Sequence, residues 1–153
     1  MPCIWGKHNG SQVFLSVAIF DDDVVARFSA AAGTSETVRM HVFKALVDTG
    51  AQGTCITSAA AEKVGLAPIG KVQIRGVGGL SFHNNYLFRV GFAFGGAGEG
   101  REVRLGSLHI VDEPIQGAEL NIRNSDFDVL LGMDIISIGS LKIDGDGSFS
   151  FSF

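Results

Sequence analysis

One acidic residue, Asp48, stands where it could take part in chemistry, in the stretch ALVDTGAQGT of residues 45–54. An apolar run precedes it, and a carboxylate that is partly withdrawn from water is costly unless it is paired or used. A single carboxylate cannot both accept a proton from water and donate one to a leaving group. Two carboxylates about 3 Å apart can do both, because such a pair shares one proton. The stretch therefore indicates half of an acid–base site.

The second carboxylate must come from outside the chain, because Asp-Thr-Gly occurs once in the 153 residues. A second copy can supply it across a twofold axis, which is the commonest symmetry of homodimers. The neighbours suit this use: Thr49 can bind backbone across the axis, Gly50 allows a ligand to approach closely, and Ala51 leaves room beside the pair. The alternative interpretation is that Asp-Thr-Gly is only a turn, which these residue types also favour.

Other chemistries lack their sequence motifs. There is no Gly-x-Ser-x-Gly motif for a serine hydrolase, and the glycines of residues 76–79 do not open a phosphate-binding loop. Cys55 has no histidine close by in the sequence and is predicted to be a small buried thiol. Asp21–Asp23 could hold a divalent cation but is interpreted as a solvated loop, and the DGDG turn at 144–147 lacks the other ligands of a calcium loop. We predict neither a metal nor a cofactor.

The composition predicts one compact domain that spans residues 1–153. Hydrophobic residues make up 46% of the chain and charged residues 18%, and 21 Gly with 12 Phe favour short strands joined by tight turns. The net charge is −4 and no basic patch occurs, so no nucleic-acid partner is expected. Two cysteines are too few for a disulfide framework. Without a membrane-length apolar stretch or a secretory signal, we expect a cytoplasmic protein or a domain of a longer one.

Several elements are well marked. The strands predicted around Asp48 cover residues 13–20, 41–47, 54–57 and 127–131. A helix is predicted over Ser58–Val64, with Thr57 as its N-cap and Gly65 at its C-terminal end. A hairpin is predicted over residues 72–82, with a glycine tip. The next strand, residues 86–94, places Tyr86, Phe88, Val90, Phe92 and Phe94 on one buried face.

Other segments carry weaker signals. Residues 21–23 are predicted as a turn, 24–40 as a hairpin, 95–100 as a turn, 102–111 as a strand pair and 112–126 as irregular. DIISIG, residues 134–139, suggests one helical turn. Residues 141–143 and 148–153 should close the chain as a hairpin, in which Phe149, Phe151 and Phe153 form an exposed edge that invites pairing with another chain. The predicted fold is mostly β, with one or two short helices.

Three motifs together resemble the retropepsin-like aspartic proteases. ALVDTGAQGTCI, then GVGG about 25 residues later, then DVLLGMD, follow that family's order over roughly residues 13–153. DTGAQ and LLGMD are most similar to the protease domain of DNA-damage-inducible proteins and to bacterial single-domain proteases. The resemblance implies a closed, barrel-like retropepsin-like acid protease fold, active as a symmetric homodimer. It also implies an aspartic endopeptidase whose partner is a peptide or protein substrate.

The resemblance assigns roles to individual positions. Asp48 matches the catalytic aspartate, Thr49 the threonine that braces the two loops, and Gly50 the glycine whose carbonyl faces the substrate. The flap matches Gly76, Val77, Gly78 and Gly79, with Val77 closing over the peptide. Leu130 is expected to reach the substrate pocket. The strand at 148–153 is expected to enter an intermolecular sheet.

The chain also departs from the retroviral pattern. Gln52, Gly53 and Met133 stand where an Asp-Asp pair and an Arg are usual, so one dimer-stabilising salt bridge is absent. Residues 21–40 and 112–126 look like insertions. Asp128, Asp134, Asp144 and Asp146 are interpreted as turn or capping residues. Two rival functions remain open: a catalytically silent module of the same fold for dimerisation or peptide binding, and a structural β-module in which Asp-Thr-Gly is a turn.

Overall fold

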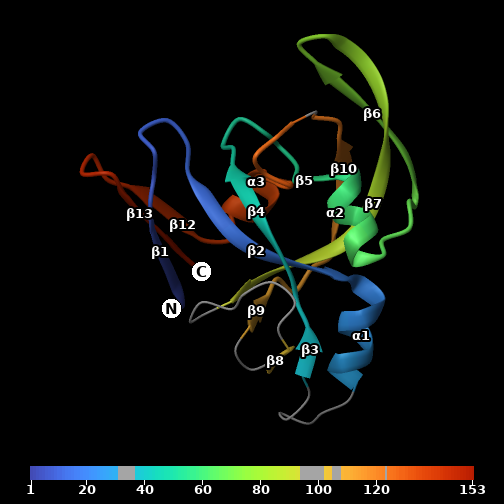
Figure 1. The fold of residues 1–153 in the computed structure, drawn as a ribbon, viewed down its shortest axis with the longest axis horizontal. Coiled ribbons are helices and arrows are strands. Elements are labelled where there is room, and N and C mark those ends of the chain that lie inside the picture. The colour runs from blue at the N-terminus through green and yellow to red at the C-terminus, as the bar shows by residue number, and fades with distance from the viewer. Residues whose placement is uncertain (31–36, 94–101, 105–107, 123) are drawn as a thin grey trace.

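The computed structural model describes residues 1–30, 37–93, 102–104, 108–122 and 124–153. The described part is mostly β, with a closed six-stranded barrel at its centre (Figure 1). Its three short helices are α1 (Asp22–Ala30), α2 (Ser58–Val64) and α3 (Met133–Ile136). Phe94 and the turn predicted at 95–100 lie outside the described residues.

Six strands form the barrel, and the last of them closes it. In ring order they are β2 (Phe14–Asp21), β4 (His41–Val47), β11 (Val129–Leu131), β5 (Cys55–Thr57), β10 (Ile115–Leu120) and β7 (Gly79–Ala93). Strand β10 pairs with β5 on one side and with β7 on the other, and β7 pairs back to β2. Strands β6 (Gly70–Gly76) and β9 (Leu108–Ile110) add to β7 outside the ring.

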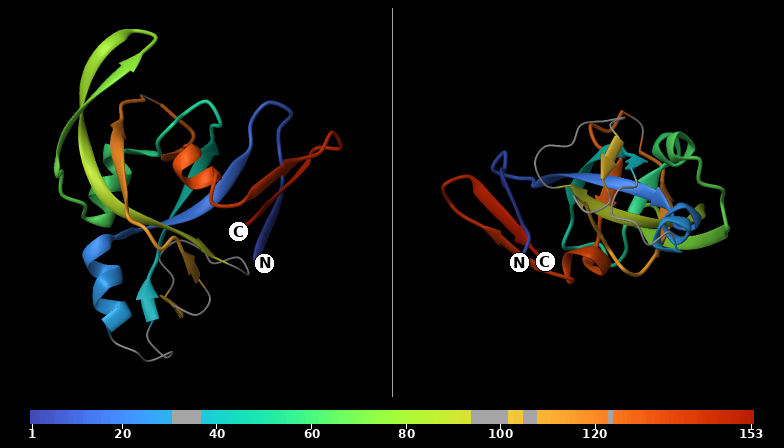
Figure 2. Two further views of the ribbon diagram at one scale, coloured as in Figure 1. Left: turned by 180° about the vertical axis from the view of Figure 1, so that it is seen from behind. Right: turned by 90° about the horizontal axis from the view of Figure 1, so that it is seen from below.

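Two smaller sheets flank the barrel. Strands β1 (Cys3–Lys7), β13 (Ser148–Ser152) and β12 (Ser140–Ile143) form a three-stranded sheet with β13 in the middle. Both chain termini lie at this sheet (Figure 2). Strands β3 (Thr37–Arg39) and β8 (Glu102–Arg104) pair with each other.

Alternating apolar residues fill the barrel as the sequence predicts. Tyr86, Phe88, Val90 and Phe92 are all buried, which confirms the face predicted for β7. The Phe92 ring lies 5.7 Å from the Phe151 ring, centroid to centroid. The apolar face of β13 therefore packs into the same core as the barrel.

The elements with strong local signals are confirmed. The hydroxyl of Thr57 accepts a hydrogen bond from the N–H of Ala60 at the start of α2, and Gly65 ends the helix in the left-handed conformation. The 72–82 hairpin forms with Gly76 opposite Gly79, and β12 with β13 closes the chain. The helical turn predicted within 134–139 forms one residue earlier and ends sooner, at Met133–Ile136.

The turn predicted at 21–23 and the hairpin predicted at 24–40 are wrong, because α1 begins at Asp22. The carboxylate of Asp21 accepts a hydrogen bond from the N–H of Asp23, and acidic residues in a first turn favour a helix. Val25 is buried with Phe20 and Met40 in a second apolar cluster. The helix forms because it covers the outer face of β2, whose burial on both sides is a tertiary effect.

The segment predicted as irregular, 112–126, contains the strand that closes the barrel. IQGAEL has few β-branched residues, but β10 gains hydrogen bonds from neighbours on both sides. Gly117 is needed there, because a Cβ at this position would lie 2.4 Å from the Phe88 ring.

The two remaining corrections concern strand partners. The strand at 148–153 is not an exposed edge: β13 is flanked by β1 and β12, and Phe149 and Phe151 are buried. Residues 102–111 do contain two strands, but β8 pairs with β3 and β9 pairs with β7. Both errors arise because a strand's partner depends on residues far away in the sequence.

Candidate active site

Asp48 directly follows β4 and lies at the rim of the barrel. Its N–H donates to the carbonyl of Leu131 at the end of β11, over 3.0 Å. Its Oδ1 accepts a hydrogen bond of 2.9 Å from the N–H of Gly50, so the side chain closes a tight turn onto its own loop. A Cβ on Gly50 would lie 3.2 Å from the same oxygen. Oδ2 of the half-buried Asp48 has no partner within the described residues.

Thr54 and Asp134 hold the Asp48 loop against the start of α3. The buried hydroxyl of Thr54 donates to Asp134 over 2.7 Å and accepts the N–H of Gly132 over 3.1 Å. The second oxygen of Asp134 accepts the backbone N–H of Thr54 over 2.9 Å. The N–H of Met133 donates in turn to the carbonyl of Ala51. These bonds fix both ends of the 48–54 loop to the late Gly-containing segment.

Gly132 allows this contact because the two backbones almost touch. A Cβ at Gly132 would lie 2.5 Å from the carbonyl carbon of Gly53, which no side chain tolerates. The glycine of LLGMD is therefore required by the approach of the Asp48 loop. This explains why Gly53 and Gly132, far apart in the sequence, occur together.

Three side chains share the face of the sheet that leads to Asp48. Leu130 lies opposite Leu46 of β4 and opposite Cys55 of β5, so the three point to one side. All three are half-buried. Burial raises the pKa of the Cys55 thiol above its ordinary value of 9.0, and the carboxylates of Asp134 and Asp48 raise it further. Cys55 is thus a neutral, largely apolar part of this surface.

A cavity of about 310 Å³ borders Asp48 and Thr49. Leu46 and Val47 also line it, together with Leu141 and Ile143 of β12. The hydroxyl of Thr49 is exposed and has no hydrogen bond in the described part of the chain. The cavity therefore opens beside the sheet that carries the free edges of β1 and β12.

The glycine-tipped hairpin projects away from the barrel (Figures 1 and 2). Val77 and Gly78 form its tip between the paired Gly76 and Gly79, and Gly79 has φ +108°, which favours glycine. Val77 is fully exposed. No described interaction joins this tip to Asp48.

The structure brings together most, but not all, of the predicted site. Asp48, Thr49, Gly50 and Ala51 form one loop, and Leu130 lies on the strand beside it. The sequence does not predict the pairing of Thr54 with Asp134, because Asp134 is expected there only as a turn or capping residue. The sequence feature that could have indicated this pairing is the position of Asp134, an acidic residue two positions after Gly132. The described residues contain no convergent group of three metal-ligating side chains and no helix that is long and apolar enough to cross a membrane.

Comparison with known proteins agrees with this arrangement. The model of the family described as aspartyl protease matches residues 37–135, which include the Asp48 loop, the hairpin and the late glycine. No curated protein sequence matches the chain. A crystal structure of a retropepsin-like aspartic protease from Rickettsia conorii is similar, with a TM-score of 0.52 and 18% identity over 98% of this chain and 89% of that one. At this identity the likeness establishes a retropepsin-like fold.

Proposed function

The chain belongs to the aspartyl protease family, and on that premise we propose that it is an aspartic endopeptidase whose active site forms between two copies. The observation that supports the proposal most directly is how the two oxygens of the Asp48 carboxylate are bonded and exposed. One oxygen is held by Gly50, the other has no partner within the described residues, and the carboxylate borders a cavity. A carboxylate fixed in this way is oriented but still free to act on water.

The second copy would supply the second carboxylate. With two Asp48 side chains close together, one carries a proton and the other is ionised. The ionised one accepts a proton from water as the water attacks the peptide carbonyl. The protonated one donates a hydrogen bond to the developing oxyanion, and a proton then passes to the leaving nitrogen. Cleavage should be fastest at acid to mildly acid pH, where the pair holds one proton.

The surrounding residues suit an extended peptide. The half-buried Leu46, Cys55 and Leu130 offer an apolar wall beside Asp48. A peptide between this wall and the hairpin can bind through its backbone, as strands do. Residues 76–79 would act as the flap, with the exposed Val77 closing over the substrate. Thr49 would brace the two Asp48 loops across the twofold axis.

The experiment that tests the function compares the wild type with Asp48→Asn on a peptide library at several pH values. We expect cleavage to fall by at least about a hundredfold, because a neutral amide cannot accept the proton of water. The thermal midpoint should change little, since Asn can still accept the hydrogen bond of Gly50. Asp126→Asn is the matched control, because Asp126 is exposed and its side chain binds Lys44. Wild-type cleavage by Asp48→Asn would exclude the mechanism.

A silent dimerisation or peptide-binding module is the second candidate. The observation in its favour is the pair Gln52 and Met133, which replaces charged dimer contacts and would weaken the dimer. Sedimentation over a concentration series, beside the cleavage assay, separates the two. A stable dimer that cleaves no peptide would favour the silent module.

A further inference from the structure

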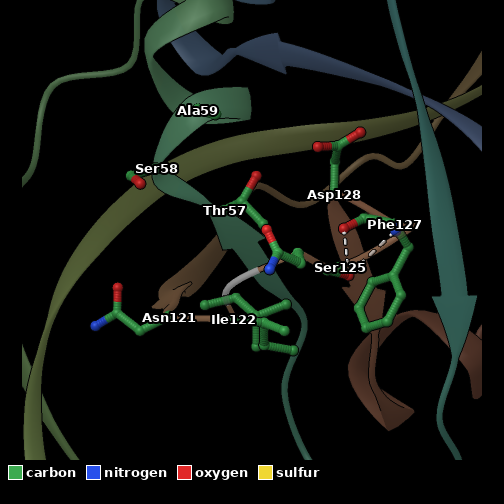
Figure 3. Close-up of a pocket in the computed structure, with 10 residues that line it drawn as sticks. Thr57, Ser58, Ala59, Asn121, Ile122, Ser125, Phe127 and Asp128 are labelled. Carbon is green, nitrogen blue, oxygen red and sulfur yellow. Dashed lines mark hydrogen bonds between the residues drawn. The ribbon is translucent and has the colours of Figure 1, made fainter.

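Figure 3 shows a second cavity, of about 580 Å³. It lies at the other end of β11 from Asp48. Asp48 follows β4 and bonds to Leu131, the last residue of β11, whereas this cavity borders Asp128, just before β11 begins. Its volume is that of a site for a small ligand or a long side chain. The cavity is thus distinct from the one beside Asp48.

Asp128 is the one charged residue among the described residues that line this cavity. Its backbone is fixed on both sides, because its N–H donates to Lys44 and its carbonyl accepts the N–H of Thr57. Its half-buried carboxylate has no hydrogen bond or ion pair in the described part of the chain. The hydroxyl of Ser58 is also without a described partner, and the two hydrogen bonds drawn in Figure 3 both join Ser125 to Phe127. A fixed, half-buried and unpaired carboxylate favours a cationic ligand.

The rim of this cavity is tied to the flap hairpin. The side-chain amide of Asn121 contacts Nδ1 of His83 over 3.3 Å, and Nε2 of His83 contacts the Ser81 hydroxyl over 2.6 Å. Ser81 and His83 lie opposite Ile74 and Val72 of β6. The half-burial of Ile74 and Val72 shows that this face of the hairpin turns toward the barrel. A peptide that runs along this face would therefore pass Asn121.

The strand register of the hairpin indicates how many substrate residues separate the cleaved bond from the cavity. His83 is four residues from Gly79 at the hairpin tip. An extended strand and an extended peptide both advance about 3.3 Å per residue, so this is about 13 Å, or roughly four substrate residues. The tip covers the bond to be cleaved in the proposed function. A side chain about four residues from that bond would then reach the cavity.

We propose that this cavity binds a lysine or arginine side chain of the peptide substrate, about four residues from the bond that is cleaved. Asp128 is its counter-ion, and the oxygens of Ser58 and Asn121 accept further hydrogen bonds from a group that can only donate. The aliphatic stem of the side chain packs on Leu120, Ile122 and Phe127. The proposal rests on the proposed peptidase function, since it makes the cavity part of substrate selection.

The test uses fluorogenic peptides that differ at one position, three to five residues from a cleaved bond, where each carries Lys, Arg, Gln or Glu. We expect the wild type to prefer Lys or Arg over Gln by about five- to tenfold in kcat/KM, as a half-buried ion pair allows. Asp128→Asn should bring the Lys-to-Gln ratio close to one. Asp126→Asn, two residues away and outside the lining, should keep the wild-type ratio. Equal ratios in the wild type and Asp128→Asn, or no basic preference in the wild type, would overturn the proposal.

Binding of the same peptides to Asp48→Asn, followed by fluorescence anisotropy, separates this proposal from the proposed function. If no peptide is cleaved by the wild type, the peptidase function fails. The cavity is then still tested by whether Lys peptides bind more tightly than Gln peptides, and whether adding Asp128→Asn removes that difference. Urea unfolding of Asp128→Asn checks the fold, and Asn121→Ala is the second variant, expected to lower the Lys-to-Gln ratio in part.

Discussion

At the scale of single residues, Thr54 matters as much to the site as the acid that it supports. Its buried hydroxyl is both a donor to Asp134 and an acceptor for the N–H of Gly132, so one atom joins the 48–54 loop to the segment at 132–134 by two hydrogen bonds. The Asp48 loop is therefore held by these side-chain hydrogen bonds in addition to the backbone hydrogen bonds that join it to Leu131 and Met133. In the proposed function, positioning of this kind would keep the Asp48 carboxylate in a fixed geometry.

Replacing Thr54 by Val should destabilise the protein by about 2 kcal/mol. Valine has nearly the same shape, but it leaves the buried N–H of Gly132 without a partner and removes one of the two hydrogen bonds that Oδ1 of Asp134 accepts. Urea unfolding measures the loss. Ser140→Ala is the control, because the exposed Ser140 side chain makes no described hydrogen bond, and it should change stability by less than about 0.5 kcal/mol. A Thr54→Val protein as stable as the wild type would show that these bonds do not hold the loop.

The ionisation of the Cys55 thiol makes the stability of the folded protein depend on pH in the alkaline range. Burial first, then Asp134 and Asp48, raise the pKa of its thiol above the ordinary value of 9.0 in the folded state. The folded protein therefore holds the proton more tightly than the unfolded chain does. The resulting stability is present below pH 9 or so and is lost as the pH rises through the folded-state pKa.

Alkylation of Cys55 by iodoacetamide should reveal this shift. With Cys3 replaced by Ser, Cys55 is the one thiol left in the chain. The alkylation rate of the native protein should rise with a midpoint above pH 9, and that of the urea-unfolded protein with a lower midpoint. In parallel, Cys55→Val should lose less stability than the wild type between pH 8 and pH 10 or so. Equal midpoints in the two states would contradict the assignment.

At the scale of elements, β10 decides whether the barrel closes. It is the strand with the weakest local signal, yet it pairs with β5 and β7 and lies directly beside the Asp48 loop. Gly117 permits this because the Phe88 ring and the carbonyl of Thr54 occupy the space where a side chain would stand. The glycine-tipped hairpin differs, because a Cβ at Gly76, Gly78 or Gly79 would meet nothing within 4 Å.

A methyl group at Gly117 should disrupt this closure. The Cβ of Gly117→Ala would lie 2.4 Å from the Phe88 ring and 3.0 Å from the carbonyl of Thr54. We expect a loss of about 2 kcal/mol in unfolding free energy, as for an overpacked core. Gly145→Ala, at a turn position with nothing nearby, should be close to neutral. If both variants unfold at the same urea concentration, Gly117 is not required for β10 to close the barrel.

At the scale of the whole molecule, one chain carries half of the proposed active site. The free edges belong to β1 and β12, because β13 lies between them, and the cavity beside Asp48 is lined in part by β12. We therefore expect a partner copy to approach from this side of the barrel. The edges offer unpaired backbone groups for a sheet that continues across the twofold axis.

Mixing wild type with Asp48→Asn tests whether two chains share one site. After the chains are exchanged at equal concentrations, random pairing leaves about a quarter of the dimers with two Asp48 residues. The activity per wild-type chain should then fall to about half of its unmixed value. If each chain were active alone, the activity per wild-type chain would not change. Mixing with Asp126→Asn is the control, and it should leave the activity unreduced.

The sequence alone determined the features that depend on neighbouring residues. The caps of α2, the glycine-tipped hairpin and the alternation of β7 are local, because each follows from residue types a few positions apart. The predictions for α2, the hairpin and β7 agree with the structure because turn, cap and periodicity rules act within one element. The Asp-Thr-Gly stretch and the late Leu-Leu-Gly indicated the fold through their resemblance to a known family, and the role of Asp48 stays a prediction.

The tertiary structure decided what depends on distant partners. Residues 22–30 form a helix because they cover β2. The segment IQGAEL forms the strand that closes the barrel because it pairs with β5 and β7. Strand β13 is an inner strand, and not an edge, because it lies between β1 and β12. The tertiary structure also joined Thr54 to Asp134 and Asn121 to His83, pairs that lie 80 and 38 positions apart along the chain. Hydrogen bonds and burial supplied by distant segments outweigh weak local preference, and such pairings are set only when the chain folds.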